Sequence, residues 1–133
     1  MSELLRRRHL VTYADTDPAG VIYYASWVPF LERLHTAWLL SNGFRDPEYE
    51  SRFGVRSACR AITVDYLRPV HLFDQLDLVL RVDHIGTTSY RIRLDYELDG
   101  ELTGYATMTV AFFAEQKAPI PDEIREALIR HQG

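Results

Sequence analysis

Residues 13–41 read YADTDPAGVIYYASWVPFLERLHTAWLLS, an acidic and turn-rich segment that leads directly into a long apolar stretch. Apolar residues in this stretch recur at the 3.6-residue period of a helix: Trp27, Leu31, Leu34 and Trp38. The spacing predicts one long helix over about Tyr24 to Ser41, buried on most sides. Pro29 then lies in the first turn, where a missing N–H costs little.

The rest of the chain reads mainly as strand. Alternating apolar and polar residues, or short apolar runs, predict five strands: Arg8 to Tyr13, Ser57 to Tyr66, Gln75 to Ile85, Ser89 to Leu98 and Glu101 to Phe113. Asp99-Gly100 is typical of a two-residue hairpin turn. We expect a loop around Pro47 and Gly54, and a short surface helix over Asp122 to His131. One strand, one long helix and four further strands indicate an α+β fold, with the helix lying across a curved antiparallel sheet.

Composition and charge restrict the class of protein. The 133 residues suffice for one domain, which we expect to span residues 1–133. The net charge is −4, and nothing resembles the concentrated basic face that nucleic acid requires. No apolar stretch approaches the ~20 residues of a membrane span, and the charged N-terminus is unlike a signal peptide. Cys59 is the only cysteine, which favours a reducing cytoplasm.

Chemistry, if the chain has any, is expected between Asp15 and Tyr24. Carboxylates before a helix commonly cap its free N–H groups, but such N–H groups can also hold a developing oxyanion. A carboxylate beside them is half of an acyl-transfer site. No G-x-S-x-G elbow is present, and the histidines lack metal-ligand spacing, so no metal site is expected. The residues alone leave the capping and the catalytic interpretations open.

The segment Asp15-Thr16-Asp17-Pro18-Ala19-Gly20-Val21-Ile22-Tyr23-Tyr24 closely resembles the signature of the 4-hydroxybenzoyl-CoA thioesterase family, whose members have the hot-dog fold. The signature is D-x-D, a Pro or Gly pair, a glycine, a hydrophobic pair and aromatic residues that open the central helix. Glu32 matches a common glutamate of the family. The resemblance implies a curved antiparallel sheet of about five strands wrapped around one long central helix.

The resemblance also implies roles for single residues. Asp17 is the catalytic carboxylate, as nucleophile or as general base, and the backbone N–H of Tyr24 polarises the thioester carbonyl. Asp15 orders the loop. Residues implied to contact the substrate are Gly20, Tyr23, Trp27, Thr88, Ser89 and Lys117. The last three would lie near the phosphates of coenzyme A, although a lysine common in the family is absent at Thr88-Ser89.

The implied function is hydrolysis of an acyl-CoA thioester, with coenzyme A as part of the substrate and no separate cofactor. Tyr23-Tyr24 and the Lys117–Pro121 segment resemble aryl-CoA hydrolases, including 1,4-dihydroxy-2-naphthoyl-CoA hydrolases, so an aromatic or polyketide-like acyl group is expected. Two alternatives stay open: a thioesterase acting on acyl-carrier protein, and a hot-dog protein that binds acyl groups without cleaving them. Relatives of this kind form dimers or tetramers, so we expect a homo-oligomer, at least a dimer.

Overall fold

The structure is a computed structural model, and residues 2–130 of it are described. Strand β1 (Glu3–Leu10) is followed by 3-10 turns η1 (Tyr13–Asp15) and η2 (Tyr24–Ser26) and by helix α1 (Trp27–Ser41). A 3-10 turn η3 (Asp46–Glu48) runs into the short helix α2 (Tyr49–Phe53). Four strands then follow, β2 (Arg56–Tyr66), β3 (Gln75–Ile85), β4 (Ser89–Leu98) and β5 (Glu101–Phe113), before helix α3 (Asp122–Arg130).

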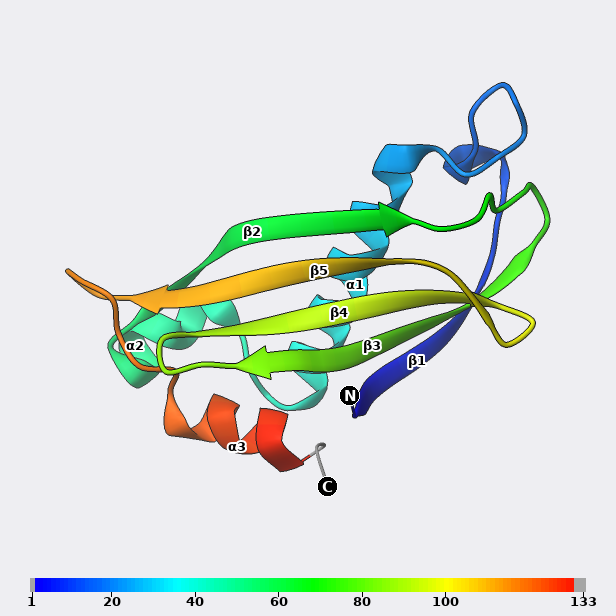
Figure 1. Ribbon diagram of the computed structural model, residues 1–133. Helices are drawn as coiled ribbons and strands as arrows, with labels where there is room; N and C mark the ends of the chain where they lie inside the picture. The colour runs from blue at the N-terminus through cyan, green and yellow to red at the C-terminus, as the bar shows by residue number, and fades with distance from the viewer. Residues whose placement is uncertain (1, 131–133) are drawn as a thin grey trace.

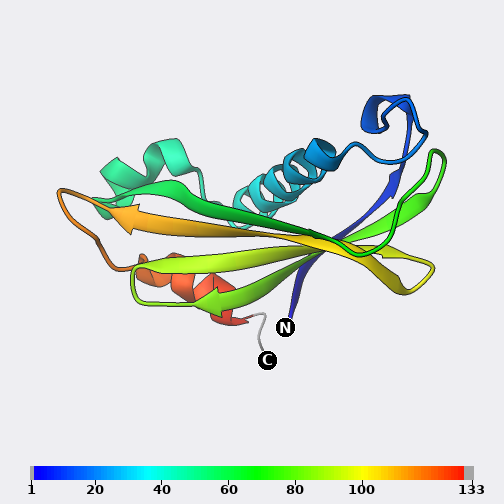
Figure 2. The ribbon, with the colours of Figure 1, turned by 45° about the horizontal axis from the view of Figure 1, so that its top comes forward.

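The five strands form one antiparallel sheet in the order β1-β3-β4-β5-β2. The sheet is twisted and curved, and α1 lies across one of its faces (Figures 1 and 2). This arrangement confirms the α+β fold with one long helix that the sequence predicts. The strands at the two edges, β1 and β2, flank the segment of chain that contains the Asp17 loop and α1.

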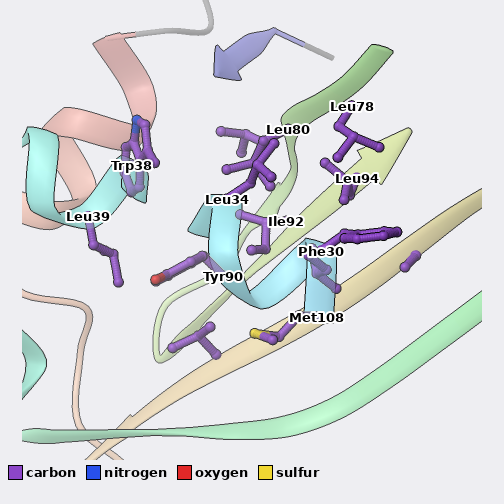
Figure 3. Close-up of a cluster of buried hydrophobic side chains, with 14 of the residues drawn as sticks. Phe30, Leu34, Trp38, Leu39, Leu78, Leu80, Tyr90, Ile92, Leu94 and Met108 are labelled. Carbon is purple, nitrogen blue, oxygen red and sulfur yellow. The ribbon is translucent and has the colours of Figure 1, made fainter. Parts of the chain in front are cut away.

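The core lies between α1 and the concave face of the sheet. Figure 3 shows side chains of α1 directed toward those of β3, β4 and β5. These side chains are 9% exposed or less: Phe30, Leu34, Trp38 and Leu39 from the helix, and Leu78, Leu80, Tyr90, Ile92, Leu94 and Met108 from the strands. Burial of a large apolar side chain stabilises a fold by about 1.5–3 kcal/mol. The helical stripe predicted from the sequence therefore anchors α1 on the sheet.

The bounds predicted for β3, β4 and β5 agree with the structure, as does the hairpin at Asp99-Gly100. Both turn residues have positive φ, 50° at Asp99 and 80° at Gly100, as a type I′ turn requires. This tight turn fixes the register in which β4 and β5 pair. The alternation along these strands was a reliable guide because one face is buried throughout.

Three predicted boundaries are wrong. The first strand, expected over Arg8 to Tyr13, is β1 at Glu3–Leu10, because β1 pairs with β3 as far back as Glu3 and Tyr13 begins a 3-10 turn. The long helix begins at Trp27 instead of Tyr24, since residues 24–26 form a separate 3-10 turn. The segment expected as loop contains η3 and α2. His131, expected to end the last helix, lies outside the described residues.

Candidate functional site

The loop that contains Asp17 is a narrow backbone hairpin. The N–H of Tyr23 donates to the carbonyl of Asp15 at 2.7 Å, and the N–H of Asp17 donates to the carbonyl of Val21 at 2.9 Å. At the tip, Gly20 adopts φ 78°, a left-handed conformation that costs glycine little. The paired backbone fixes which residues of the loop face each other, with Asp17 at the tip and Tyr23 at the base.

The carboxylate of Asp17 is half-buried and partly fixed by its own turn. Its Oδ1 accepts a hydrogen bond from the Ala19 N–H at 2.8 Å, the geometry of an Asx turn. Within residues 2–130, Oδ2 has no hydrogen-bond donor. The turn therefore orients the carboxyl group and leaves one oxygen free to accept a proton or to attack a carbon.

The loop is held to the end of the sheet by the chain between β2 and β3. The N–H of Ile22 donates to the carbonyl of Val70 at 2.7 Å, and the N–H of Leu72 donates to the carbonyl of Gly20 at 2.9 Å. Val70 is fully buried, whereas the loop it supports is largely exposed. The position of Asp17 is thus set by backbone contacts to a segment about fifty residues farther along the chain.

Tyr23 and Tyr24 follow the hairpin and are both exposed, at 42% and 63%. Their ring centroids lie 4.5 Å apart. The Tyr66 hydroxyl donates to the Tyr24 carbonyl at 2.7 Å, while no acceptor within the described chain meets the Tyr24 N–H. An uncommitted N–H at the start of a helical turn is able to donate to a carbonyl oxygen of a ligand. The hairpin pairing places this N–H beyond the base of the loop, beside Asp15.

Asp15 orders the beginning of the loop. Its Oδ2 accepts the Thr12 N–H at 3.0 Å and lies 2.9 Å from Nε2 of His9. The His9 ring in turn packs against the ring of Phe30 of α1, with centroids 4.5 Å apart and the planes tilted by 52°. Both contacts are made by Oδ2, so the Asp15 carboxylate is held between His9 and the backbone at the start of the loop.

Trp27 lies in the core of the chain and is 1% exposed. Its ring centroid is 3.8 Å from that of Tyr96 and 5.5 Å from that of Tyr66. Gly104 of β5 lies directly beneath it, where an added Cβ would come within 2.9 Å of the indole. The structure therefore favours a packing role for Trp27 over the substrate contact that the resemblance implies.

Thr88, Ser89 and Lys117 lie together, but far from Asp17. The Thr88 carbonyl accepts the Phe112 N–H at 2.9 Å, Ser89 begins β4, and exposed Lys117 forms a bridge with Phe113. Figure 1 shows these segments at one end of the sheet and the Asp17 loop at the other. A single chain thus keeps the two groups of implied site residues apart.

A cavity of about 450 Å³, which we call the α2 pocket, was missed by the sequence analysis. It lies between the C-terminal half of α1, the segment 44–49, and the sheet. The signal was the apolar pair Phe44 and Tyr49 in a segment expected to be loop, where both prove to be buried. At the pocket, Nε2 of His35 and the Tyr90 hydroxyl are 2.7 Å apart.

Two further features are relevant to function. Within residues 2–130, no cluster of three or more His, Cys, Asp or Glu side chains is arranged to hold a metal ion. Over the same part of the chain, no helix has the length and apolar character needed to span a bilayer.

Comparison with known proteins assigns the family. A family model for the thioesterase-like superfamily matches residues 11–128, which include the Asp17 loop, α1 and the whole sheet apart from β1. The chain belongs to the thioesterase-like superfamily. The family that the D-x-D segment resembles is therefore confirmed at this level, together with the fold.

Curated members of the superfamily are similar to this chain. The acyl-CoA thioester hydrolase YbgC of Escherichia coli O157:H7 is 35% identical over 79 residues, which are 59% of this chain and 58% of that protein. This match thus spans little more than half the length of YbgC. The 1,4-dihydroxy-2-naphthoyl-CoA hydrolase of Synechococcus elongatus is 27% identical over 130 residues, which cover 91% of this chain and 92% of the relative.

Solved structures of the superfamily share the fold. The 1,4-dihydroxy-2-naphthoyl-CoA thioesterase of Synechocystis superposes with a TM-score of 0.82 at 20% identity, covering 96% of this chain and 97% of that one. A gentisyl-coenzyme A thioesterase gives a TM-score of 0.76 at 17% identity, covering 94% and 99%. At such identities the likeness concerns the fold alone.

Proposed function

We propose that this protein hydrolyses acyl-CoA thioesters with Asp17 as its catalytic carboxylate. The observation that carries the proposal is the state of that carboxyl group: the Ala19 N–H holds Oδ1, while Oδ2 is free in a loop that also exposes the unused Tyr24 N–H. Membership of the thioesterase-like superfamily supports this reaction class, as do the activities named for the similar curated proteins.

Two routes use the same residues. As a general base, Asp17 takes a proton from water, the hydroxide adds to the thioester carbon, and the C–S bond breaks to release the carboxylic acid and the thiol. As a nucleophile, the Asp17 carboxylate displaces the thiolate to form a mixed anhydride, which water then cleaves. In both routes the Tyr24 N–H donates to the carbonyl oxygen as negative charge develops there. Coenzyme A is part of the substrate, and neither route needs a separate cofactor.

We also propose that the working unit is a homodimer. Strand β2 is a sheet edge of 11 residues, most of them exposed, and such an edge is a template for pairing with another chain. Antiparallel pairing of two β2 strands about Ala61 would set the Asp17 loop of one chain toward the Thr88 end of the other. Thr88, Ser89 and Lys117 would then serve the nucleotide of a substrate held at the partner's Asp17 loop.

The preferred acyl group is proposed to be aromatic or polyketide-like. Exposed aromatic rings gather around the loop, with Tyr13 74% exposed, Tyr23 42% and Tyr24 63%, and flat rings pack well on such surfaces. The naphthoyl group named for the Synechococcus relative is of this kind. The single free thiol of Cys59 supports a cytoplasmic location, and we propose that residues 1–133 form one domain.

A panel of thioesters tests the proposal. Benzoyl-, hydroxybenzoyl-, dihydroxynaphthoyl- and straight-chain acyl-CoAs are assayed with wild type, Asp17→Asn and the control Asp99→Asn. Asp99 lies in the β4–β5 turn at φ 50°, a conformation that asparagine adopts readily. Asp17→Asn should lower kcat by about 10²–10⁴-fold, while Asp99→Asn stays at the wild-type rate. Equal rates for wild type and Asp17→Asn would remove Asp17 from its role.

The same panel separates the alternatives. A thioesterase for acyl-carrier protein would cleave the protein-bound thioester faster than the CoA ester and would tolerate Lys117→Ala. A protein that only binds acyl groups would show no turnover, and its binding would be unaffected by Asp17→Asn. In single-turnover hydrolysis in ¹⁸O-water, label in the Asp17 carboxyl would establish the nucleophilic route, because it enters only when Asp17 forms an anhydride that water attacks at the aspartyl carbon.

A further inference from the structure

His9 of β1 lies where the edge of the sheet, the Asp17 loop and α1 meet. Figure 1 shows β1 running directly into the loop. His9 pairs with Leu76 of β3, and its ring packs against Phe30 in the first turn of α1. Its Nε2 lies 2.9 Å from Oδ2 of Asp15. The His9 side chain is 30% exposed. One ring on the sheet thus contacts both the helix and the loop.

Asp15 extends this contact to both arms of the loop. Its Oδ2 also accepts the Thr12 N–H at 3.0 Å, which ties the carboxylate to the chain that leaves β1. Its carbonyl accepts the Tyr23 N–H at 2.7 Å and the Ser26 hydroxyl at 3.3 Å, both from the returning arm. The Asp15 side chain is 13% exposed, and shielding from water strengthens hydrogen bonds to a carboxylate. Asp15 therefore joins β1 to the returning arm.

The returning arm carries the N–H that we propose to bind the thioester oxygen. The peptide unit that bears the Tyr24 N–H has the Tyr23 carbonyl at its other end, and this carbonyl accepts the Ser26 N–H at 2.8 Å. Tyr23 and Ser26 are also the two residues that donate to the Asp15 carbonyl. The direction of the Tyr24 N–H is therefore set by residues that are held by Asp15.

The same contacts set the distance between the two reactive groups of the loop. The Asp15–Tyr23 hydrogen bond closes the base of the hairpin, and the hydrogen bond from Asp17 to Val21 is the next along it. The loop is largely exposed, so few side-chain contacts hold it apart from those at its base. Displacement of a reacting group by about 1 Å can cost about 10²-fold in rate. The anchor at the base of the hairpin is therefore expected to affect the rate of the reaction.

The anchor requires a donor on the His9 ring. A carboxylate only accepts hydrogen bonds, so the contact to Asp15 needs a proton on Nε2 of His9. An apolar side chain at this position would pack against Phe30 equally well but would give the Asp15 carboxylate no hydrogen bond. The chemistry of the ring, as well as its shape, is thus used.

We propose that His9 is a positioning residue for thioester hydrolysis, which acts through Asp15 to fix the Tyr24 N–H relative to the Asp17 carboxylate. His9 itself does not touch the substrate. The inference rests on the proposed function, since Asp17 and the Tyr24 N–H act in that reaction.

The test uses two substitutions of His9 in the full-length protein. His9→Leu keeps an apolar side chain against Phe30 and removes the donor. His9→Gln restores an N–H at the same place, because the amide nitrogen of glutamine and Nε2 of histidine are the same number of bonds from Cβ. The control His84→Leu makes the same change at an exposed histidine near the other end of the sheet.

Hydrogen exchange followed by NMR measures the loop without any substrate. His9→Leu should accelerate exchange of the Tyr23 N–H by roughly 10-fold relative to the Leu94 N–H, the effect of weakening one hydrogen bond. Leu94 lies in the central strand β4 and is fully buried, so its N–H reports global unfolding. His9→Gln and His84→Leu should leave the ratio of the two exchange rates at the wild-type value.

Steady-state kinetics on the best thioester of the panel measure the reaction. His9→Leu should lower kcat by roughly 10- to 100-fold and leave KM within about twofold of wild type, because orientation of the reacting groups is lost while binding is kept. His9→Gln should keep kcat within about threefold of wild type. His84→Leu should change neither kcat nor KM.

The outcomes keep the two proposals apart. Faster Tyr23 exchange and a lower kcat in His9→Leu, both restored in His9→Gln, support the inference. Unchanged Tyr23 exchange, unchanged kcat, a rise in KM alone, or equal losses in the two His9 variants overturn it, whatever the result with Asp17→Asn. A wild type that cleaves no thioester defeats the proposed function, and the exchange measurement then decides by itself whether His9 positions the loop.

Discussion

The Asp17 loop and the α2 pocket are built in opposite ways. The loop is held by backbone hydrogen bonds, carries exposed aromatic side chains, and presents a free carboxylate oxygen and a free N–H. The interior of the pocket is lined by buried side chains, and the polar side chains there, such as His35 and Tyr49, are neutral. A reaction site needs unpaired groups that substrate can reach, whereas a selective pocket needs shape. In this chain the loop and the pocket lie at different ends of one sheet.

The largest effect is expected from a variant that leaves the Asp17 loop and the α2 pocket intact but prevents two chains from pairing and bringing the two regions together. Ala61→Glu places a carboxylate at the centre of the exposed β2 edge, where it would face its own copy across the twofold axis. Like charges juxtaposed in an interface cost several kcal/mol. We expect a shift from dimer to monomer by light scattering and loss of hydrolysis together.

The matched control is Leu10→Glu on β1, the other edge of the sheet, where Leu10 is 48% exposed. It should leave the mass and the rate unchanged. A monomeric wild type at micromolar concentration, or a monomeric Ala61→Glu with full activity, would contradict the proposed homodimer.

The second prediction concerns the pocket alone. The pKa of His35 is about 4 in the folded protein and 6.5 in the unfolded chain, so the native state binds fewer protons between these values. Stability should be constant above pH 6.5, fall by about 3 kcal/mol as pH drops to 4, and then level off. The charged side chains at the rim of the pocket are Glu32, Asp46, Glu48 and Arg45.

Denaturant unfolding of wild type and His35→Gln across pH 4–7 isolates the contribution of His35. Below pH 6.5 wild type should lose more stability than His35→Gln, because glutamine does not titrate. His84→Gln, at an exposed position, serves as control. If wild type and His35→Gln lose the same stability as the pH falls, the burial of His35 does not contribute to the pH dependence of stability.

The third prediction concerns the support beneath the loop. In Gly104→Ala the new methyl group would lie 2.7 Å from the Asp65 carbonyl oxygen and 2.9 Å from the Trp27 ring. Overpacking of this kind costs about 1–3 kcal/mol, so the free energy of unfolding should fall by about 2 kcal/mol. Because Trp27 begins α1 next to the loop, kcat should also fall. Unchanged stability would show that β5 shifts at Gly104 and makes room for the methyl group.

The smallest effect is expected at Lys117, the only lysine in the sequence. Exposed ion pairs contribute about 0.2–1 kcal/mol, so Lys117→Ala should raise KM for CoA esters two- to fivefold without changing kcat. Steady-state kinetics at two salt concentrations check this, since the wild-type advantage should shrink at high salt. A larger fall in kcat than in kcat/KM would exclude a simple role in nucleotide binding.

The sequence predicted what local pattern determines. Strands β3 and β4 were placed to the residue because apolar and polar side chains alternate along them, and β5 because it follows the Asp99-Gly100 turn. The stripe of Trp27, Leu31, Leu34 and Trp38 placed the helix. The start of β1 was missed because the three consecutive arginines Arg6, Arg7 and Arg8 interrupt the alternation of apolar and polar residues. Helix α2 was missed because five residues are too few to show a helical period. The α2 pocket joins residues from α1, β2, β4 and β5, which only the tertiary structure brings together.

The strand order has a consequence for folding. Strands β3, β4 and β5 are neighbours both in sequence and in the sheet, so their hairpins close with short loops. Strand β1 must join β3, and β2 must join β5, across much longer stretches of chain, and such closures lose more chain entropy and are slower. These two late strands flank the Asp17 loop. The Asp17 loop therefore takes shape after the central meander, so mutations within it should accelerate unfolding more than they slow folding.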